Sequence, residues 1–141
     1  MKFGLFGSAQ ARRGVARDEA ARGFHDYVET NIEAEALGYH STFLVEHHFT
    51  GMGQVSASLD LQAWVAARTS RLRIGTAVIV LPWHNPILLA EQAATLDLMS
   101  GGRLDLGVGR GSIQPAARKS GCPSWRDSPR VVITGITVTR V

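Results

Sequence analysis

The sequence predicts an α/β fold of about four parallel strands with intervening helices, followed by an irregular tail. Short apolar runs alternate with segments of helical spacing along residues 1–111, the connections between them are short, and the alternation ends after Gly111. Strands joined through helices pair in parallel. The alternation alone fits two architectures, an open doubly wound sheet and a piece of a closed (β/α)8 barrel.

The first four elements follow from composition and period. Residues 2–6 are an apolar run suited to a buried strand. Apolar side chains recur every four positions in residues 24–37, which predicts a helix, and Gly38 closes it because glycine adopts the left-handed conformation without steric cost. Residues 42–46 have the composition of a strand, and residues 59–70 group apolar side chains on one side of a second helix. The positions concerned are Phe24, Val28, Ile32 and Ala36 in the first helix and Leu61, Trp64 and Val65 in the second.

The remaining elements lie between residues 72 and 108. Residues 72–81 have almost no polar interruption, which is typical of a central strand covered on both faces. Asn85 and Pro86 predict a helix start, because the Asn side chain caps free amide groups and Pro supplies a preset dihedral angle. This helix runs to about residue 99, where two glycines stop it. Its expected apolar face is Leu88, Leu89, Ala93 and Leu96, and a fourth strand is expected at residues 103–108.

Length and composition indicate a single folded domain. The 141 residues can bury a real core, and 45% hydrophobic with 19% charged residues is typical of a globular protein. No apolar run approaches the roughly 20 residues of a membrane helix, and the N-terminus lacks the pattern of a secretory signal. We therefore expect a cytoplasmic protein with no membrane partner. Cys122 is the only cysteine, which excludes an intramolecular disulfide and a thiolate metal cluster.

The net charge of +3 is unevenly distributed. Residues 1–111 hold ten basic and eleven acidic side chains, a balance of −1, whereas residues 112–141 hold five basic and one acidic, a balance of +4. The body therefore lacks the basic face that nucleic-acid binding requires. Residues 112–130 contain three prolines and no helical period, although a βα unit should place a helix there. We expect residues 1–111 to form one unit and residues 112–141 an irregular basic tail, with one weak strand within residues 131–141.

Glu46, His47 and His48 directly follow the second predicted strand. Parallel α/β folds bind ligands at the carboxyl ends of their strands. Successive side chains of a strand point to opposite faces, so at most one of the two histidines can face a given cavity. An imidazole suits a general base or a hydrogen bond to a reactive species; the alternative is one histidine that caps the strand and one in solvent. Adjacent histidines do not easily reach one ion, so no metal is expected.

A glycine-rich stretch, GVGRG at residues 107–111, follows the fourth strand. It fails the dinucleotide fingerprint, because Ser112 stands where the third glycine is needed and the fingerprint belongs on the first strand. It offers backbone without bulky side chains beside Arg110, which can hold a phosphate or the edge of a planar ring; a plain turn with a solvated Arg110 is the alternative. Composition does not decide whether Trp83 and His84 face a pocket or solvent.

Four stretches agree in order with one known family: KFGLF, EAEALGYHSTFLVEHHF, RLRIGTAVIVLPWHNPILLAEQAATLDLMSGGR and LDLGVGRG. Together they resemble the bacterial luciferase-like flavin-dependent monooxygenases, close to the alkanal monooxygenase branch, over about residues 1–111. The resemblance implies the N-terminal part of a (β/α)8 TIM barrel in which the second, third and fourth strands end on one face. It also implies that reduced FMN and O2 oxidise a small organic substrate such as an aldehyde.

The resemblance also implies roles for particular residues. His47 matches the catalytic histidine of the family, which assists the oxygen chemistry of the flavin. The family places a non-proline cis peptide under the flavin ring, one residue beside the ring and an arginine near the flavin phosphate. The matching cofactor-binding positions here are Ala77 and Val78 for the cis peptide, Gly109 beside the ring and Arg110 at the phosphate, with Glu46 next to the histidine.

The chain also departs from the family pattern. A complete barrel takes about 250 residues, and the resemblance covers roughly its first four strands. After GVGRG the family continues with an aromatic, acidic, glycine-rich stretch and a long helix, whereas SIQPAARKSGCPSWRDSPR does not. Such a change at Ser112 is what a frameshift or gene truncation would leave.

Half a barrel has two open sheet edges, which are a liability unless two chains pair. We therefore expect a homodimer or heterodimer. Two other functions fit the same residues: a non-catalytic half-barrel that acts as a binding or assembly module, and a deazaflavin-dependent oxidoreductase that transfers hydride without oxygen.

Overall fold

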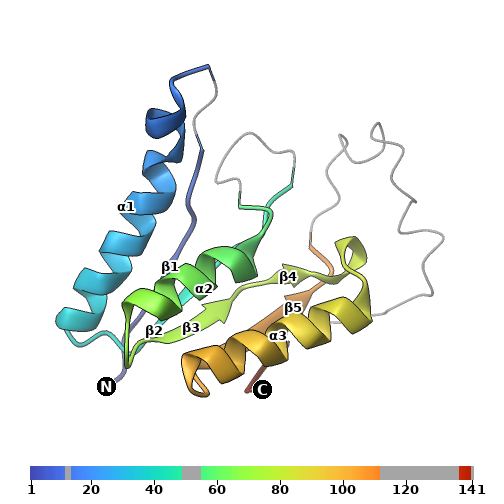
Figure 1. Ribbon diagram of the computed structural model, residues 1–141. Helices are drawn as coiled ribbons and strands as arrows, with labels where there is room; N and C mark the ends of the chain where they lie inside the picture. The colour runs from blue at the N-terminus through green and yellow to red at the C-terminus, as the bar shows by residue number, and fades with distance from the viewer. Residues whose placement is uncertain (12–13, 49–54, 112–136, 141) are drawn as a thin grey trace.

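The computed structural model describes residues 1–11, 14–48, 55–111 and 137–140 (Figure 1). These residues form one sheet with the strand order β1-β2-β3-β5-β4, and β6 pairs with β5 off this path. Neighbours from β1 to β5 are parallel, whereas β6 is antiparallel to β5. The strands are β1 (Gly4–Gly7), β2 (Ser41–Leu44), β3 (Arg73–Thr76), β4 (Ile79–Val80), β5 (Leu104–Gly109) and β6 (Thr137–Arg140).

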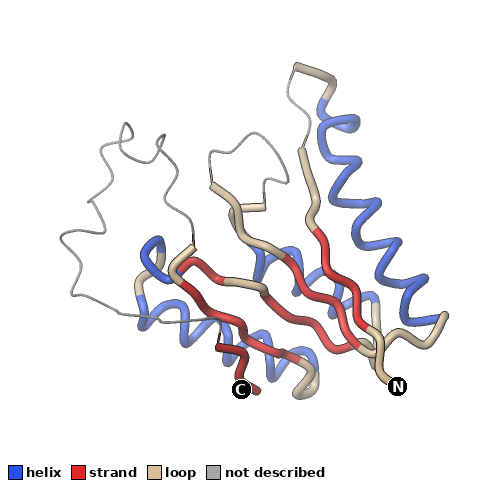
Figure 2. The backbone as a smooth tube through the Cα atoms, turned by 180° about the vertical axis from the view of Figure 1, so that it is seen from behind, coloured by secondary structure: helices blue, strands red, loops and turns tan. Residues whose placement is uncertain are grey.

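Three α-helices connect the parallel strands and lie on the same face of the sheet. Seen from behind, the strands lie in front of the helices (Figure 2). The helices are α1 (Arg17–Ala36), α2 (Ser58–Arg68) and α3 (Pro86–Ser100), and a 3-10 turn, η1 (Leu81–Trp83), precedes α3. This arrangement confirms the predicted α/β class with parallel strands, and the carboxyl ends of β2, β4 and β5 lie at one end of the sheet (Figure 1).

The core lies between the helices and the sheet. Val28 of α1 and Val65 of α2 are at most 1% exposed, and they pack against side chains from β2, β3 and β5. Each such side chain contributes about 1.5–3 kcal/mol through burial of apolar area. The fully buried members of this cluster from the sheet and its approaches are Leu44, Leu72, Ile74 and Leu104, and Ile79 of β4 is also fully buried.

The third predicted strand, residues 72–81, is divided in the structure. β3 and β4 are separated by a break that contains a cis peptide bond between Ala77 and Val78, the position where the resemblance implies one. Both pieces pair with β5, Ile74 opposite Leu104 and Ile79 opposite Val108. The prediction of one unbroken strand is therefore wrong, because apolar composition carries no signal for a break.

The helix boundaries show what local signals can determine. α1 begins at Arg17, ahead of the predicted residue 24. The prediction missed its first turns because they are charged and carry no apolar period. The start of α3 is confirmed: Asn85 Oδ1 accepts hydrogen bonds from the N–H groups of Ile87 (3.0 Å) and Leu88 (3.3 Å). Leu88 was predicted to be in the buried face, but it is 55% exposed.

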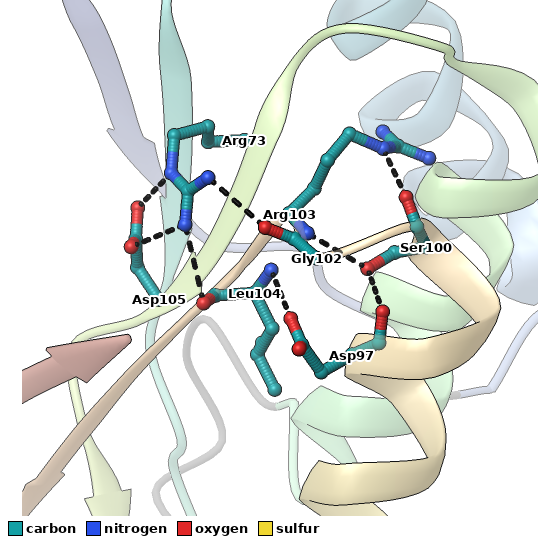
Figure 3. Close-up of polar contacts among 7 residues, drawn as sticks. All are labelled: Arg73, Asp97, Ser100, Gly102, Arg103, Leu104 and Asp105. Carbon is teal, nitrogen blue, oxygen red and sulfur yellow. Dashed lines mark hydrogen bonds and ion pairs between the residues drawn. The ribbon is translucent and has the colours of Figure 1, made fainter. Parts of the chain in front are cut away.

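The amino ends of β3 and β5 are joined by two arginines (Figure 3). Arg73 makes a bidentate ion pair with Asp105, at 2.8 Å from Nε and 2.7 Å from Nη2, and both side chains are only 14% exposed. The Asp105 carboxylate raises the pKa of Arg73. Arg103 instead donates to the carbonyl groups of Ala66 in α2, Ser100 at the end of α3 and Leu72 before β3, so side chains hold this end of the sheet together.

A carboxylate at the C-terminal end of α1 holds the loop between α2 and β3. Glu35 accepts hydrogen bonds from the backbone N–H groups of Ser70 (3.0 Å), Arg71 (2.7 Å) and Leu72 (2.6 Å). Partial burial alone would raise the pKa of Glu35, but these hydrogen bonds lower it to about 2. The α2–β3 connection is therefore fixed from outside its own helix and strand.

The last described segment is β6, which lies within residues 131–141, where one strand was predicted. It pairs with β5 from Asp105 opposite Arg140 to Val108 opposite Thr137. The predicted irregular stretch after Gly111 lies outside the described residues. Within the part of the chain that the structure describes, no helix is long and apolar enough to cross a bilayer.

Candidate functional site

Glu46 lies two residues beyond the end of β2 and is buried, with 4% of the residue exposed. Its carboxylate accepts hydrogen bonds from His48 Nε2 at 2.6 Å and from His84 Nε2 at 2.9 and 3.0 Å. The backbone N–H of Val80, in β4, donates to the same carboxylate at 3.2 Å. One buried side chain therefore connects the end of β2 to the segment that follows the cis peptide.

The electrostatics of this cluster favour a carboxylate. Burial on its own would raise the pKa of Glu46, but hydrogen bonds from His84 and His48, the positive charge that His84 can carry, and the Val80 N–H together lower it. An ionised Glu46 accepts hydrogen bonds only, so each imidazole must present its Nε2 as a donor. The carboxylate thereby selects the tautomer of both rings.

His84 was left undecided by the sequence, and the structure brings it into the site. It follows η1, and its backbone N–H donates to the carbonyl of Leu81 at 3.0 Å, which orients the residue toward Glu46. The neighbouring Trp83 lies against the ring of His48, with 5.1 Å between centroids and 31° between planes. Spacing could not find this partnership, because Glu46 and His84 lie on different βα units.

His47 is exposed, in contrast to its two neighbours in the chain. Its backbone N–H donates to the carbonyl of Val55 at 2.9 Å, which holds the start of the loop after β2. His48 is turned toward Glu46, so the two histidines lie in different environments, as the alternation of a strand predicts. His47 is thus the more exposed histidine of this motif, while 17% of the His48 side chain is exposed.

The residues around the cis peptide form a close-packed surface at the ends of β3 and β5. The Ala77 N–H donates to the carbonyl of Leu44 at 2.8 Å, so the segment lies beside the end of β2. A Cβ added at Gly109 would lie 2.9 Å from Val78 Cγ2, and one added at Gly111 would lie 2.5 Å from Val80 Cγ1. Glycine at both positions therefore lets the chain after β5 approach the segment after the cis peptide.

Arg110 follows Gly109 and is exposed at the carboxyl end of β5. The structure thus joins Glu46 to Val80 by a hydrogen bond and packs Val78 against Gly109, and His47 and Arg110 are the chain neighbours of Glu46 and Gly109. A flavin mononucleotide has a planar ring and a phosphate. Small residues at Ala77 and Gly109, with an exposed guanidinium one residue beyond, fit those two parts.

A metal centre does not follow from this cluster. The Nε2 atoms of both histidines are at hydrogen-bond distance from the Glu46 oxygens. Among the residues whose positions are described, no group of three or more His, Cys, Asp or Glu side chains has the arrangement to hold a metal ion.

Comparison with known proteins places this site in a family context. The sequence model of the luciferase-like monooxygenase family matches residues 1–132. A luciferase-like monooxygenase from Escherichia coli K12 is 44% identical over 109 residues, which cover 77% of this chain and 31% of that protein. The chain therefore spans about a third of the length of this relative.

Two solved structures share the fold. The oxygenating constituent of 3,6-diketocamphane monooxygenase from Pseudomonas putida, a type II Baeyer–Villiger monooxygenase in complex with FMN, superposes with a TM-score of 0.75 at 23% identity, over 88% of this chain and 33% of that one. Coenzyme F420 dependent tetrahydromethanopterin reductase from Methanopyrus kandleri gives 0.64 at 22% identity, over 88% and 31%.

These likenesses confirm the fold class as the N-terminal part of a (β/α)8 TIM barrel, which parallel strands with helices on one face already indicated. The family match covers far more than half of the chain, and it includes every element from β1 to β5. This chain belongs to the luciferase-like monooxygenase family.

Proposed function

We propose that this chain carries the flavin-binding part of a luciferase-like monooxygenase, which uses reduced FMN and O2 to oxidise a small organic substrate such as an aldehyde. The observation that supports it best is the meeting of β2, β4 and β5 at one end of the sheet, with an exposed His47, a surface of small residues and an exposed Arg110 around it. Reduced flavin, when bound, supplies the electrons and reacts with oxygen; the protein binds, orients and excludes water.

Each site residue has a role in this proposal. His47 is the catalytic residue, because it is the accessible imidazole of the motif and can hold or transfer a proton. Ala77, Val78 and Gly109 lie against the ring, where Ala77 has only a methyl side chain and Gly109 has none, and Arg110 binds the phosphate. Glu46 contributes to the cofactor site through its hydrogen bonds to His48, His84 and the Val80 N–H, because its own side chain is fully buried.

The likeness to a coenzyme F420 dependent reductase favours a second candidate, a deazaflavin-dependent oxidoreductase that transfers hydride without oxygen. Oxygen consumption distinguishes the two candidate functions. Turnover of a reduced deazaflavin with no oxygen uptake would favour the second. Absence of FMN binding, or FMN binding without turnover, would favour a non-catalytic half-barrel that acts as a binding or assembly module.

We expect His47→Ala to slow aldehyde oxidation by about 100-fold while the Kd for FMN stays within about threefold. A general acid or base contributes roughly 10²–10⁴-fold to a rate, whereas an imidazole that acts on the reacting groups adds little to ground-state affinity. Oxygen uptake with reduced FMN measures the rate, and a fluorescence titration measures binding. His40→Ala, at the opposite end of β2, is the control. An unchanged rate in His47→Ala would contradict the assignment.

We also propose that two chains pair, and that α3 contributes to the contact. The helix is apolar on nearly all sides, and four of its large apolar side chains are at least 55% exposed. A helix that is apolar all round is normally buried. Sedimentation velocity should show a dimer that Leu98→Lys with Met99→Lys weakens, and a monomer at all concentrations would argue against pairing. The four side chains are Ile87, Leu88, Leu98 and Met99.

The domain division remains part of the proposal. Residues 1–111 hold every described element from β1 to β5 and all the proposed site residues. We propose that they are the functional unit and that residues 112–141 are a basic tail from a shifted reading frame, of which β6 pairs with β5. Resequencing the gene through the codons after Gly111 tests this, because a second reading frame would encode the continuation of the barrel.

A further inference from the structure

The site contains a histidine whose role the proposed reaction does not assign. His84 lies beyond η1, on a different βα unit from the histidines at residues 47 and 48. Its Nε2 bridges both oxygens of Glu46, at 2.9 and 3.0 Å, and its side chain is 23% exposed while that of Glu46 is fully buried. This hydrogen bond connects the end of β2 to the segment after η1, beyond the last residue pair of the β2–β3 ladder, Leu44 with Thr76.

The partners of Glu46 show what this bridge controls. On one side the carboxylate accepts from His48 at 2.6 Å, and the ring of His48 lies against Trp83, immediately before His84. On the other side it accepts from the Val80 N–H at 3.2 Å. Val80 pairs with Gly109 of β5, where the proposed flavin ring and phosphate positions meet. The carboxylate therefore holds the two strand ends between which the cofactor would lie.

The stability of that arrangement depends on both imidazoles. A buried carboxylate needs several donors, and removing one leaves a desolvated charge that the others must satisfy. Without His84, Glu46 would turn toward water or toward His48, and the Val80 N–H would lose a properly placed acceptor. The end of β2 would then lose its side-chain connection to Val80 in β4, while the backbone hydrogen bond from Ala77 to Leu44 would remain.

We propose that His84 is a positioning residue of the flavin site: it holds Glu46 so that the carboxylate joins the segment at residues 77–80 to the loop that carries His47. This inference rests on the proposed function, because that function supplies the flavin as the ligand of the site. His84 acts through Glu46 and does not itself contact the cofactor. His84 contributes by placing correctly the residues that contact the cofactor.

The experiment compares His84→Gln with His84→Asn, which carry the same amide on side chains that differ by one methylene. The amide nitrogen of Gln reaches about the position of Nε2 and can donate to Glu46, whereas that of Asn stops near the position of Nδ1. Two readouts are used: hydrogen exchange of the Val80 amide, followed by NMR without ligand, and the Kd for FMN. His40→Gln is the matched control outside the cluster.

We expect His84→Asn to speed exchange of the Val80 amide by at least about tenfold and to weaken FMN binding by about tenfold. His84→Gln should return both within about threefold of the original chain. Equal behaviour of the two variants, or an unchanged Val80 amide in His84→Asn, would overturn the inference. A general loss of folding would change both variants and many amides together, which the Gln rescue excludes.

The two proposals can fail separately. If the Val80 amide responds as expected but the original chain binds no FMN, the proposed function fails and the positioning role of His84 stands. If FMN binds and the Gln and Asn variants do not differ, the positioning role fails alone. Should His84→Asn not fold, His84→Leu supplies the same test, because its side chain fills much of the same space but has no N–H to donate to Glu46; normal Val80 exchange in that variant would then reject the inference.

Discussion

Replacing Arg103 by Met should lower the free energy of unfolding by about 3 kcal/mol. Its guanidinium donates to the carbonyl oxygens of Ser100 (2.6 Å), Leu72 (2.9 Å) and Ala66 (2.9 Å). Two further hydrogen bonds go to Thr69, at the end of α2. Hydrogen bonds from a charged donor contribute about 1.5–3 kcal/mol each, but they are not additive, and water can reach some of these carbonyl groups.

Urea unfolding followed by circular dichroism measures this change. Met keeps much of the length and apolar stem of Arg but has no N–H group, so the comparison isolates the hydrogen bonds. Arg71→Met is the control, since that side chain is exposed, and it should change the free energy by less than about 0.5 kcal/mol. Equal effects of the two substitutions would show that Arg103 does not connect the helix ends to the sheet. Partial burial already lowers the pKa of Arg103, and the Glu35 charge opposes that change.

The fold was largely predictable because each βα unit carries its own local signals. The Asn85 cap, Gly38 after α1 and the apolar period of α2 were all read correctly from a few neighbouring residues. The errors arose where a long-range contact decides the outcome. Leu88 has the spacing of a buried residue, yet no described segment covers it. The break between β3 and β4 falls inside an apolar run with almost no polar interruption, and composition carries no signal for it.

The site was predictable in part for the same reason. The motif after β2 predicted a site at Glu46 and the adjacent histidines, and the resemblance predicted the position of the cis peptide. The contact between Glu46 and His84 could not be read from the sequence, because it depends on where η1 lies relative to β2. A histidine directly before the helix-capping Asn85 was the only local signal for it.

The two ends of the sheet therefore differ in the interactions that their side chains make. At the amino ends of the strands, hydrogen bonds from Arg103 fix α2 and α3 to the sheet, and the ion pair of Arg73 with Asp105 joins β3 to β5 (Figure 3). At the carboxyl ends, Glu46 holds two imidazoles while His47 and Arg110 stay accessible. Stability and proposed chemistry are thus separated along the strand direction, as in other barrel folds.

Acid should destabilise the protein through Glu35, and Glu35→Gln should remove much of that pH dependence. The hydrogen bonds from Ser70, Arg71 and Leu72 lower the pKa of Glu35 from 4.5 to about 2 in the folded chain. A lowered folded pKa means that the stabilisation is fully present above about pH 4.5 and is lost as the pH falls toward about 2, because the unfolded chain takes up the proton first. After allowance for solvent screening at this partly exposed site, we expect about 2 kcal/mol.

The measurement is the free energy of unfolding in urea at several pH values between 2 and 7. For the original chain it should fall steeply between about pH 4.5 and 2, and for Glu35→Gln it should be lower at pH 7 and flatter through that window. Glu33→Gln, on an exposed position of the same helix, should keep the original slope. If the slopes of the Glu35 and Glu33 variants coincide, the α2–β3 loop is not held by the carboxylate. The hydrogen bonds would then follow from the loop's own conformation, because a loop that is already fixed needs no charged acceptor to keep its N–H groups in place.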